Sequence, residues 1–298
     1  MTSPEPLRRV ALVLGLALAS LTLAGAVSAK AADAGGAEHA IERQDWSFAG
    51  FTGLYDRAQL QRGFQVYQQV CSACHSLSRV RFRNLAEPGG PEFPEEAVKA
   101  LAASWPYAIH GEVDDEGNEV ERVPGLADPI VGPFKNEKQA RSAYNGALPL
   151  DLSLITKART VESHAPWYSH WFWMLADIAT GYQEAGADYL YALLTGYEEP
   201  PAGFQMNEGM YYNVAFPGHQ IAMPPPLSPD MVVEYQPDAG AKSTFQQNAK
   251  DVTAFLAWAA DPSLDARKEL GWFVMLYLLI TTVLLYLVKK LIWSRIKH

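Results

Sequence analysis

The 298-residue sequence has few cysteines and few basic residues. Its two cysteines are too few for a disulfide-stabilised scaffold in a chain of this length. The 24 Lys and Arg residues against 33 Asp and Glu give a formal net charge of −9, which argues against a nucleic-acid partner. Hydrophobic residues make up 49% and charged residues 19%, so the composition excludes a disordered or collagen-like chain.

The negative charge is concentrated in the body of the chain. Residues 1–29 carry +1 and residues 289–298 carry +4, so subtracting both from −9 leaves −14 for residues 30–288. Such a body favours a basic protein partner and disfavours docking on an anionic surface. Six of its acids fall within residues 112–121, a run that we interpret as a solvated face.

The N-terminus has the pattern of a secretory signal peptide. Arg8 and Arg9 precede an uncharged apolar run over residues 10–23, and small residues follow at 27–29. We therefore expect residues 1–29 to be removed and the mature chain to begin near Lys30. An uncleaved anchor is the alternative, because the uncharged stretch continues to Ala29.

The second apolar segment is the 18-residue uncharged run over residues 271–288. It predicts a transmembrane helix over residues 266–290, with Trp272 and Trp293 near its ends. A buried core helix is the alternative, but the run is apolar on all sides. The basic flank that follows it places residues 291–298 in the cytoplasm and residues 30–265 on the outer side of the membrane.

Between these segments the periodicity predicts helices rather than long strands. Residues 56–70 and 243–260 have apolar residues at helical spacing, and proline-rich loops cover 124–133 and 199–229. Gly63 is a weak helix former in the middle of the first helix, which suggests close approach of another backbone. We expect the two helices to pack crosswise at this glycine.

Cys71, Cys74 and His75 form a C-x-x-C-H motif, which is the attachment site of a c-type haem. Two thiols at this spacing can each add to a vinyl group of one porphyrin, and the adjacent imidazole becomes an axial iron ligand. The alternative is a redox-active C-x-x-C pair, which would also require a βαβ pattern that is not visible in the sequence.

A second axial ligand would make the haem an electron carrier, whereas an open iron site would indicate a haem enzyme or a gas sensor. Met223 is one candidate, because three prolines follow it and hold the chain extended. His219 is the other candidate, and it would give a bis-histidine haem of lower potential.

Four stretches make the chain resemble the cytochrome c1 family, the membrane-anchored haem subunits of quinol–cytochrome c oxidoreductase (the cytochrome bc1 complex). They are Cys71–His75, Ala140–Ser153, Leu193–Gly203 and Ile221–Leu227. C-x-x-C-H alone indicates only a c-type cytochrome. The Asn-Gly-Ala-Leu-Pro and Thr-Gly-Tyr sequences within the second and third stretches narrow the resemblance to this family.

The resemblance implies a mostly α fold, a class I-like cytochrome c domain with long ordered loops plus one C-terminal transmembrane helix. It implies one covalently attached haem c on Cys71 and Cys74, with His75 and Met223 as iron ligands and Arg141 at a haem propionate. The chain departs from the family at Leu150, where a second proline is usual.

The resemblance also implies the partners and the location of the chain. The expected partners are cytochrome b, a Rieske iron–sulfur protein, a soluble basic cytochrome c and the lipid membrane. The haem domain, residues 30–265, would lie in the periplasm of a bacterium and be held at the inner membrane. A haem subunit of a terminal oxidase, or a free-standing tethered electron shuttle, is the closest alternative.

Two regions look like insertions relative to shorter relatives of this family. One is the acidic run at 112–121. The other spans about 160–187 and is rich in aromatic residues, among them Trp167, Tyr168, Trp171, Phe172 and Trp173. We expect the aromatic segment to belong to the core rather than to a surface that faces a neighbouring subunit.

Overall fold

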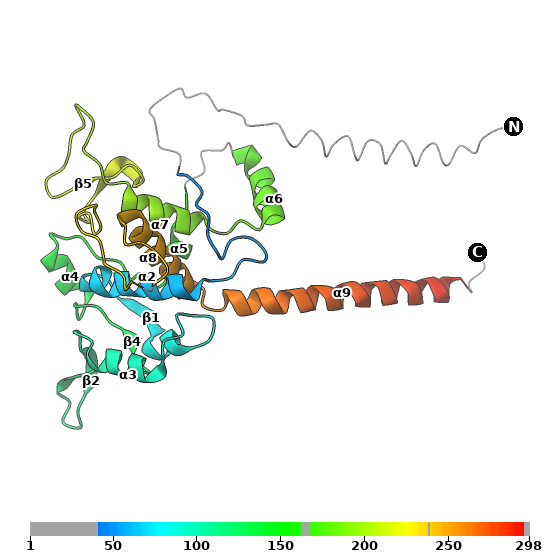
Figure 1. Cartoon of the computed structure of the whole chain (residues 1–298), viewed down its shortest axis with the longest axis horizontal. Coiled ribbons are helices and arrows are strands. Elements are labelled where there is room, and N and C mark those ends of the chain that lie inside the picture. Colours follow the sequence, from blue (N-terminus) through cyan, green and yellow to red (C-terminus); the bar gives the residue numbers. More distant parts are fainter. Residues whose placement is uncertain (1–40, 162–166, 238, 295–298) are drawn as a thin grey trace. The chain divides into compact units, whose positions relative to one another are not determined.

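The computed structural model describes residues 41–161, 167–237 and 239–294, so the predicted signal peptide and residues 295–298 of the tail lie outside the described residues (Figure 1). The described elements are α2 (Arg57–Gln69), η1 (Cys71–Ala73), β1 (Leu77–Arg81), η2 (Phe82–Ala86), α3 (Glu95–Ala103), β2 (Ile109–Val113), β3 (Glu119–Arg122), β4 (Pro129–Ile130), α4 (Glu137–Ala143), α5 (Ile155–Ala158), η3 (Trp167–Ser169), α6 (His170–Thr180), α7 (Ala185–Thr195), β5 (Tyr211–Tyr212), η4 (Pro217–His219), β6 (Gln220–Ile221), α8 (Phe245–Ala260) and α9 (Leu264–Trp293).

The fold is mostly α, as predicted. The described strands form three antiparallel two-stranded sheets, β1 with β4, β2 with β3 and β5 with β6. None of these strands exceeds five residues, which agrees with the lack of a long strand pattern in the sequence. Long loops between the helices make up much of the remainder (Figure 1).

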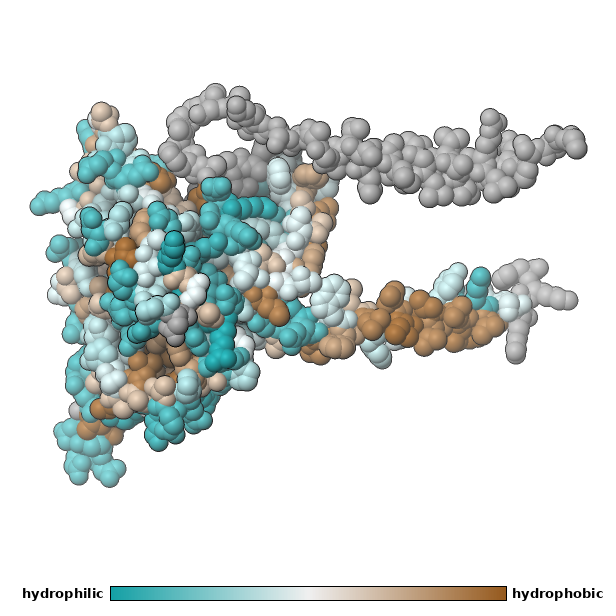
Figure 2. All heavy atoms as spheres, viewed as in Figure 1, coloured by the Kyte–Doolittle hydropathy of each residue, from teal (hydrophilic) through white to brown (hydrophobic). Residues whose placement is uncertain are grey.

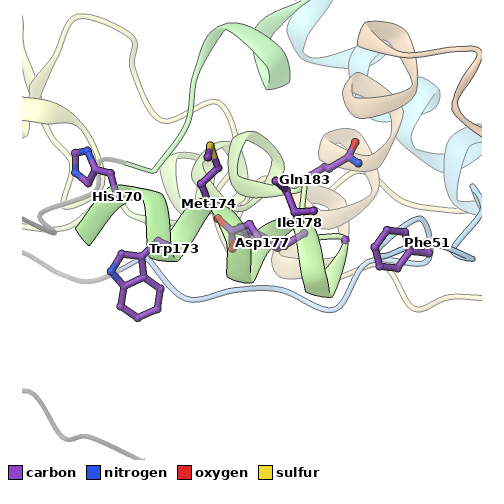
Figure 3. A pocket seen from close by; sticks show the side chains of 9 residues that line it. Phe51, His170, Trp173, Met174, Asp177, Ile178 and Gln183 are labelled. Carbon is purple, nitrogen blue, oxygen red and sulfur yellow. The ribbon is translucent and has the colours of Figure 1, made fainter. Parts of the chain in front are cut away.

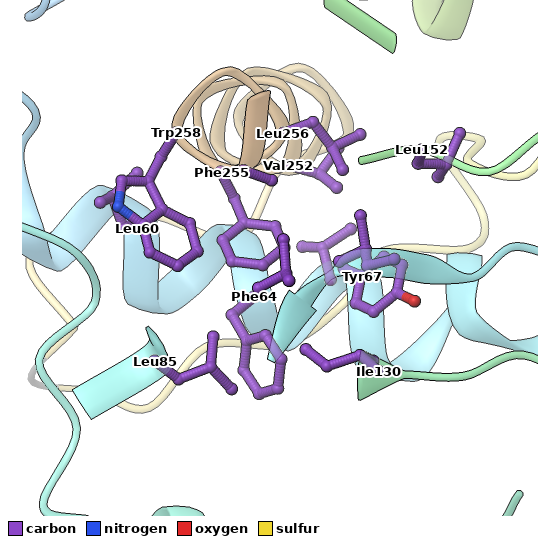
Figure 4. Packing of buried hydrophobic residues seen from close by; sticks show 14 of the residues in the cluster. Leu60, Phe64, Tyr67, Leu85, Ile130, Leu152, Val252, Phe255, Leu256 and Trp258 are labelled. Carbon is purple, nitrogen blue, oxygen red and sulfur yellow. The ribbon is translucent and has the colours of Figure 1, made fainter. Parts of the chain in front are cut away.

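The centre of the core is the packing of α2 against α8. Asp56 caps α2, because its carboxylate accepts hydrogen bonds from the backbone N–H groups of Ala58 and Gln59. Figure 4 shows α8 nearly end-on while α2 runs across the view, so the two helices cross as predicted. The rings of Phe64 and Phe255 meet edge to face, with centroids 5.5 Å apart.

Gly63 lies at the point where the two helices cross. A Cβ atom at this position would lie 2.1 Å from the carbonyl oxygen of Asp251 and 2.6 Å from the Cβ of Phe255. Any side chain would therefore push the helices apart, so the prediction that Gly63 permits close approach is confirmed.

A buried ion pair joins the same two helices. Arg62 Nε lies 2.8 Å from Asp251 Oδ2, and the Asp251 side chain has no exposed surface. Gln59 and Gln247 donate further hydrogen bonds to this carboxylate, at 3.0 and 2.7 Å. Arg62 also donates to the carbonyl oxygen of Ala239, so most of the polar groups of the pair have partners.

The C-terminal segment forms one continuous helix, α9, which is two residues longer at its start and three longer at its end than the predicted 266–290. It is the one described helix that is long and apolar enough to cross a membrane, and its most hydrophobic window has no residue buried against the rest of the chain. Figure 2 shows it as an almost continuous hydrophobic surface. Its length and composition are those of a membrane anchor.

The prediction for the aromatic segment is wrong over α6. None of the residues of this helix is buried, and the side chains of Trp171, Phe172 and Trp173 are 62%, 55% and 51% exposed. The interpretation of the acidic run as a solvated face is confirmed, because it forms the exposed hairpin of β2 and β3. Within this hairpin, a hydrogen bond from Arg122 lowers the pKa of Glu112.

Candidate haem site

The C-x-x-C-H motif begins directly where α2 ends. Cys71–Ala73 form the short helix η1, and the N–H groups of Cys74 and His75 both donate to the carbonyl oxygen of Cys71. The Ser72 hydroxyl donates to Gln68 in the last turn of α2, which fixes η1 to that helix. This tight turn places both thiols and the imidazole within five consecutive residues.

Both thiols are free and half-buried. Burial, with a smaller effect from the neighbouring Cys74, raises the pKa of Cys71 to about 12. A redox-active C-x-x-C pair needs the opposite, a lowered pKa that exposes a reactive thiolate. The surroundings of Cys71 therefore disfavour the redox alternative.

His75 is held in an orientation that suits an iron ligand. Its Nδ1 lies 2.7 Å from the carbonyl oxygen of Leu150, so Nδ1–H donates to this oxygen and the lone pair of Nε2 stays available. Burial lowers the pKa of His75, which favours the neutral form that binds metals. The Tyr67 hydroxyl donates to the backbone carbonyl of His75 at 2.9 Å and fixes the main chain.

Asp151, the residue after Leu150, connects this loop to the segment that follows His75. Its carboxylate accepts hydrogen bonds from the Ser76 hydroxyl at 2.8 Å and from the Ser78 backbone N–H at 2.7 Å. Burial alone would raise the pKa of Asp151, but these hydrogen bonds and those from Ser153 lower it. The departure at Leu150 leaves this arrangement intact, because His75 uses the backbone oxygen and not the side chain.

Met223 is half-buried against the main hydrophobic cluster, and Cys71 packs against the same cluster. The Tyr197 hydroxyl donates to the carbonyl oxygen of Met223 at 3.1 Å, which ties the methionine loop to the Thr-Gly-Tyr stretch after α7. Leu227, four residues further on, is 2% exposed and anchors the other end of the loop.

His219, the rival ligand, has other contacts. Its Nδ1 lies 3.3 Å from the carbonyl oxygen of Asn213, and its ring lies against Tyr212 with centroids 5.6 Å apart. The described contacts of the His219 imidazole are thus with β5 and the residue that follows it, whereas Met223 packs against the same cluster as Cys71.

Arg141 is exposed at the end of α4, where it donates to the carbonyl oxygen of Gly146 at 3.0 Å. Three residues later, the Tyr144 hydroxyl lies 2.9 Å from the sulfur of Cys74. Arg141 also lies 4.0 Å from the carboxylate of Glu137, and Tyr144 directly follows α4, so the end of this helix lies next to the motif. This position is compatible with a contact to a haem propionate.

The sequence reasoning did not find Tyr67, Tyr144, Asp151 or Tyr197. Three of these four lie inside the stretches that support the family resemblance. The sequence therefore marked these stretches but did not show which residues their side chains contact. Tyr67 lies in the buried stripe of α2, and a buried tyrosine hydroxyl usually has a hydrogen-bond partner, which here is the carbonyl oxygen of His75.

Taken together, these residues fit a covalently bound haem. Two thiols lie on one turn, an oriented imidazole follows them, and a thioether packs against the same apolar cluster as Cys71. Cys71 and Cys74 would form the thioether bonds, and His75 would bind iron from one side.

Comparison with known proteins agrees with this site. The family model described as the Cytochrome C1 family matches residues 46–296. Cytochrome c1 of Blastochloris viridis is 46% identical over 288 residues, which cover 97% of this chain and 95% of the relative. Cytochrome c1 of Rhodospirillum rubrum is 39% identical over 299 residues, covering 95% and 97%. Cytochrome b/c1 of Bradyrhizobium diazoefficiens is 48% identical over 250 residues, covering 84% of this chain and 35% of that longer relative.

Proposed function

The chain belongs to the cytochrome c1 family and is a membrane-anchored haem c protein of the cytochrome bc1 complex, and we propose that it takes one electron from a Rieske iron–sulfur protein and passes it to a soluble cytochrome c. The name of the Bradyrhizobium relative joins cytochrome b and cytochrome c1 in one protein, which supports cytochrome b as a partner. When bound, the haem supplies a reversible one-electron couple.

The observation that supports an electron carrier best is the hydrogen bond between His75 and Leu150. It orients the imidazole so that Nε2 would be free to bind iron, and we propose that Met223 would supply a thioether as the second protein ligand. Two protein ligands leave no open position for a substrate or a gas, which disfavours the haem-enzyme and gas-sensor alternatives. We further propose that Arg141 pairs with a haem propionate, since a guanidinium suits a carboxylate.

The function can be tested on the native complex purified from membranes. We expect this chain to co-purify with cytochrome b and a Rieske protein, and its haem to be reduced within one turnover after quinol is added. Removal of the Rieske subunit should abolish this fast reduction while leaving the haem spectrum unchanged. Co-purification with terminal-oxidase subunits instead would support the alternative and refute the proposal.

We propose that residues 1–29 are a cleaved signal peptide, that residues 30–265 form a periplasmic haem domain and that residues 291–298 are cytoplasmic. The basic residues after the anchor support this orientation in a bacterial inner membrane. The intact mass of the mature protein should correspond to a chain that begins near Lys30 and carries one haem. A mature chain that retains Arg8 would contradict the cleavage.

The rate of electron transfer to a basic cytochrome c should fall steeply as salt rises. Residues 30–288 carry −14, and long-range charge steers transient redox partners. The Debye length shortens from about 30 Å at 0.01 M salt to about 10 Å at 0.1 M, which screens this attraction. Stopped-flow measurement of the second-order rate constant against ionic strength checks this expectation.

Two double variants, each removing two exposed acids, should locate the steering charges. Glu198 and Glu199 directly follow Tyr197, which binds the Met223 loop, whereas Asp115 and Glu116 lie at the tip of the acidic hairpin. We expect E198Q/E199Q to lower the low-salt rate constant about two- to fivefold and D115N/E116Q to change it less. A larger decrease in D115N/E116Q than in E198Q/E199Q would place docking at the hairpin. A rate constant independent of salt in the unmodified protein would refute charge steering.

A further inference from the structure

Helix α6 presents an apolar stripe that no described residue covers. Trp171, Met174, Leu175 and Ile178 recur at the spacing of one helix face, and their side chains are 62%, 57%, 51% and 61% exposed. An isolated helix of 11 residues is marginally stable in water, so this helix needs a surface to pack against.

The single acid of α6 lies at the edge of this stripe, beside Met174 and Ile178. Asp177 is half-buried and its carboxylate lies 3.3 Å from Nη2 of Arg43 in an ion pair. Gly181 ends the helix in a left-handed conformation, and the Tyr182 N–H donates to the carbonyl oxygen of Asp177. Arg43 and the turn at Gly181 thus connect α6 to the rest of the domain, while the side chains of the stripe stay more than half exposed.

The end of α6 and the start of the membrane anchor contact the same loop. A Cβ atom on Gly181 would lie 3.1 Å from the ring of Phe51. Lys268, three residues before the uncharged span begins at Gly271, donates to the carbonyl oxygens of Phe48 and Gly53 at 2.7 and 2.9 Å. Three helical residues rise only about 4.5 Å, so this loop lies where α9 enters the bilayer.

Exposed apolar side chains extend from α6 onto this loop. Phe51 and Leu54 are 55% and 39% exposed. Phe51 and the side chains of Met174 and Ile178 border an open cleft of about 500 Å³ (Figure 3). The stripe and the loop at the start of the anchor therefore border the same cleft, whose lining also includes His170, Asp177 and Gln183.

The chemistry of the stripe suits lipid better than protein. Its only strong hydrogen-bonding group is the indole N–H of Trp171, whereas protein interfaces contain about one hydrogen bond per 100–200 Å². Tryptophan rings concentrate at the membrane–water boundary, where the apolar part faces the acyl chains and the N–H faces water. Residues 170–180 contain no Lys or Arg, so binding needs no anionic lipid.

We propose that α6 lies in the interfacial layer of the bilayer with Trp171, Met174, Leu175 and Ile178 in contact with lipid, as a second membrane contact beside α9. The contact would restrain the tilt of the haem domain relative to the anchor.

The test uses the assembled complex in discs of phosphatidylcholine bilayer, and each variant is compared with the same sample under nitrogen to subtract the relaxation that its own metal centres cause. Nitroxide labels are attached to Met174→Cys, Ile178→Cys and, as a control on the exposed face of α3, Lys99→Cys. At the two stripe positions we expect collisions with oxygen, which concentrates in lipid, to exceed those with a water-soluble nickel chelate several-fold. At Lys99→Cys the chelate should dominate.

Two outcomes would overturn the proposal. Dominance of the chelate at the stripe would show that α6 faces water. Low accessibility to both quenchers would show that a protein subunit, such as cytochrome b, covers the stripe. Leu175→Cys provides a further stripe position if either variant fails to assemble, and an unchanged haem spectrum confirms that each labelled protein is folded.

Discussion

Replacement of Met223 by leucine is expected to lower the midpoint potential of the haem and to let carbon monoxide bind the reduced iron. A thioether stabilises ferrous iron, and leucine keeps the volume of the side chain but has no atom that binds metal. Axial ligands set haem potentials over a span of about 0.8 V, so we expect a decrease on the order of hundreds of millivolts. Potentiometric titration and the carbon monoxide difference spectrum measure the two effects.

Two control variants make this result specific. Met231→Leu alters an exposed methionine in the same late segment and should leave the potential unchanged. His219→Ala removes the rival ligand, whose described contacts are with Tyr212 and Asn213. If Met223→Leu left the midpoint potential unchanged and His219→Ala allowed carbon monoxide to bind, the assignment of Met223 as the second iron ligand would be wrong.

Replacement of Arg62 by leucine is expected to destabilise the haem domain by about 3–5 kcal/mol, the usual cost of removing one partner of a buried ion pair. Asp251 would remain without exposed surface and would keep only the amide donors of Gln59 and Gln247. Guanidinium unfolding of the solubilised holoprotein, followed by tryptophan fluorescence, measures the change in the free energy of unfolding.

An ion pair five residues earlier on α2 provides the matched control. Arg57 lies 3.3 Å from Glu92, but both side chains are more than one third exposed, so Arg57→Leu should cost less than about 1 kcal/mol. The double variant R62L/D251L should recover much of the loss, because it leaves no unpaired buried charge. Equal losses in R62L and R57L would refute the special cost of the buried pair.

Local features of the sequence predicted the main parts of the fold and of the site. Helices α2 and α8 follow from apolar residues at helical spacing, and the anchor follows from an uncharged run that leaves no polar face. Cys71, Cys74 and His75 are adjacent in the chain, so their shared turn needs no long-range contact. Glycine inside a helix destabilises it, so Gly63 indicated a packing requirement, which is the close approach of a second helix.

The tertiary structure decided what depends on distant parts of the chain. His75 is oriented by a backbone oxygen 75 residues away, and backbone oxygens are the same for every residue type, so no sequence pattern marks this one. Asp251 looks like a surface acid in the sequence and becomes buried only when Arg62 from α2 meets it. The apolar sequence of α6 fits a core helix as well as a surface helix, and only its lack of covering neighbours in the folded chain distinguishes the two.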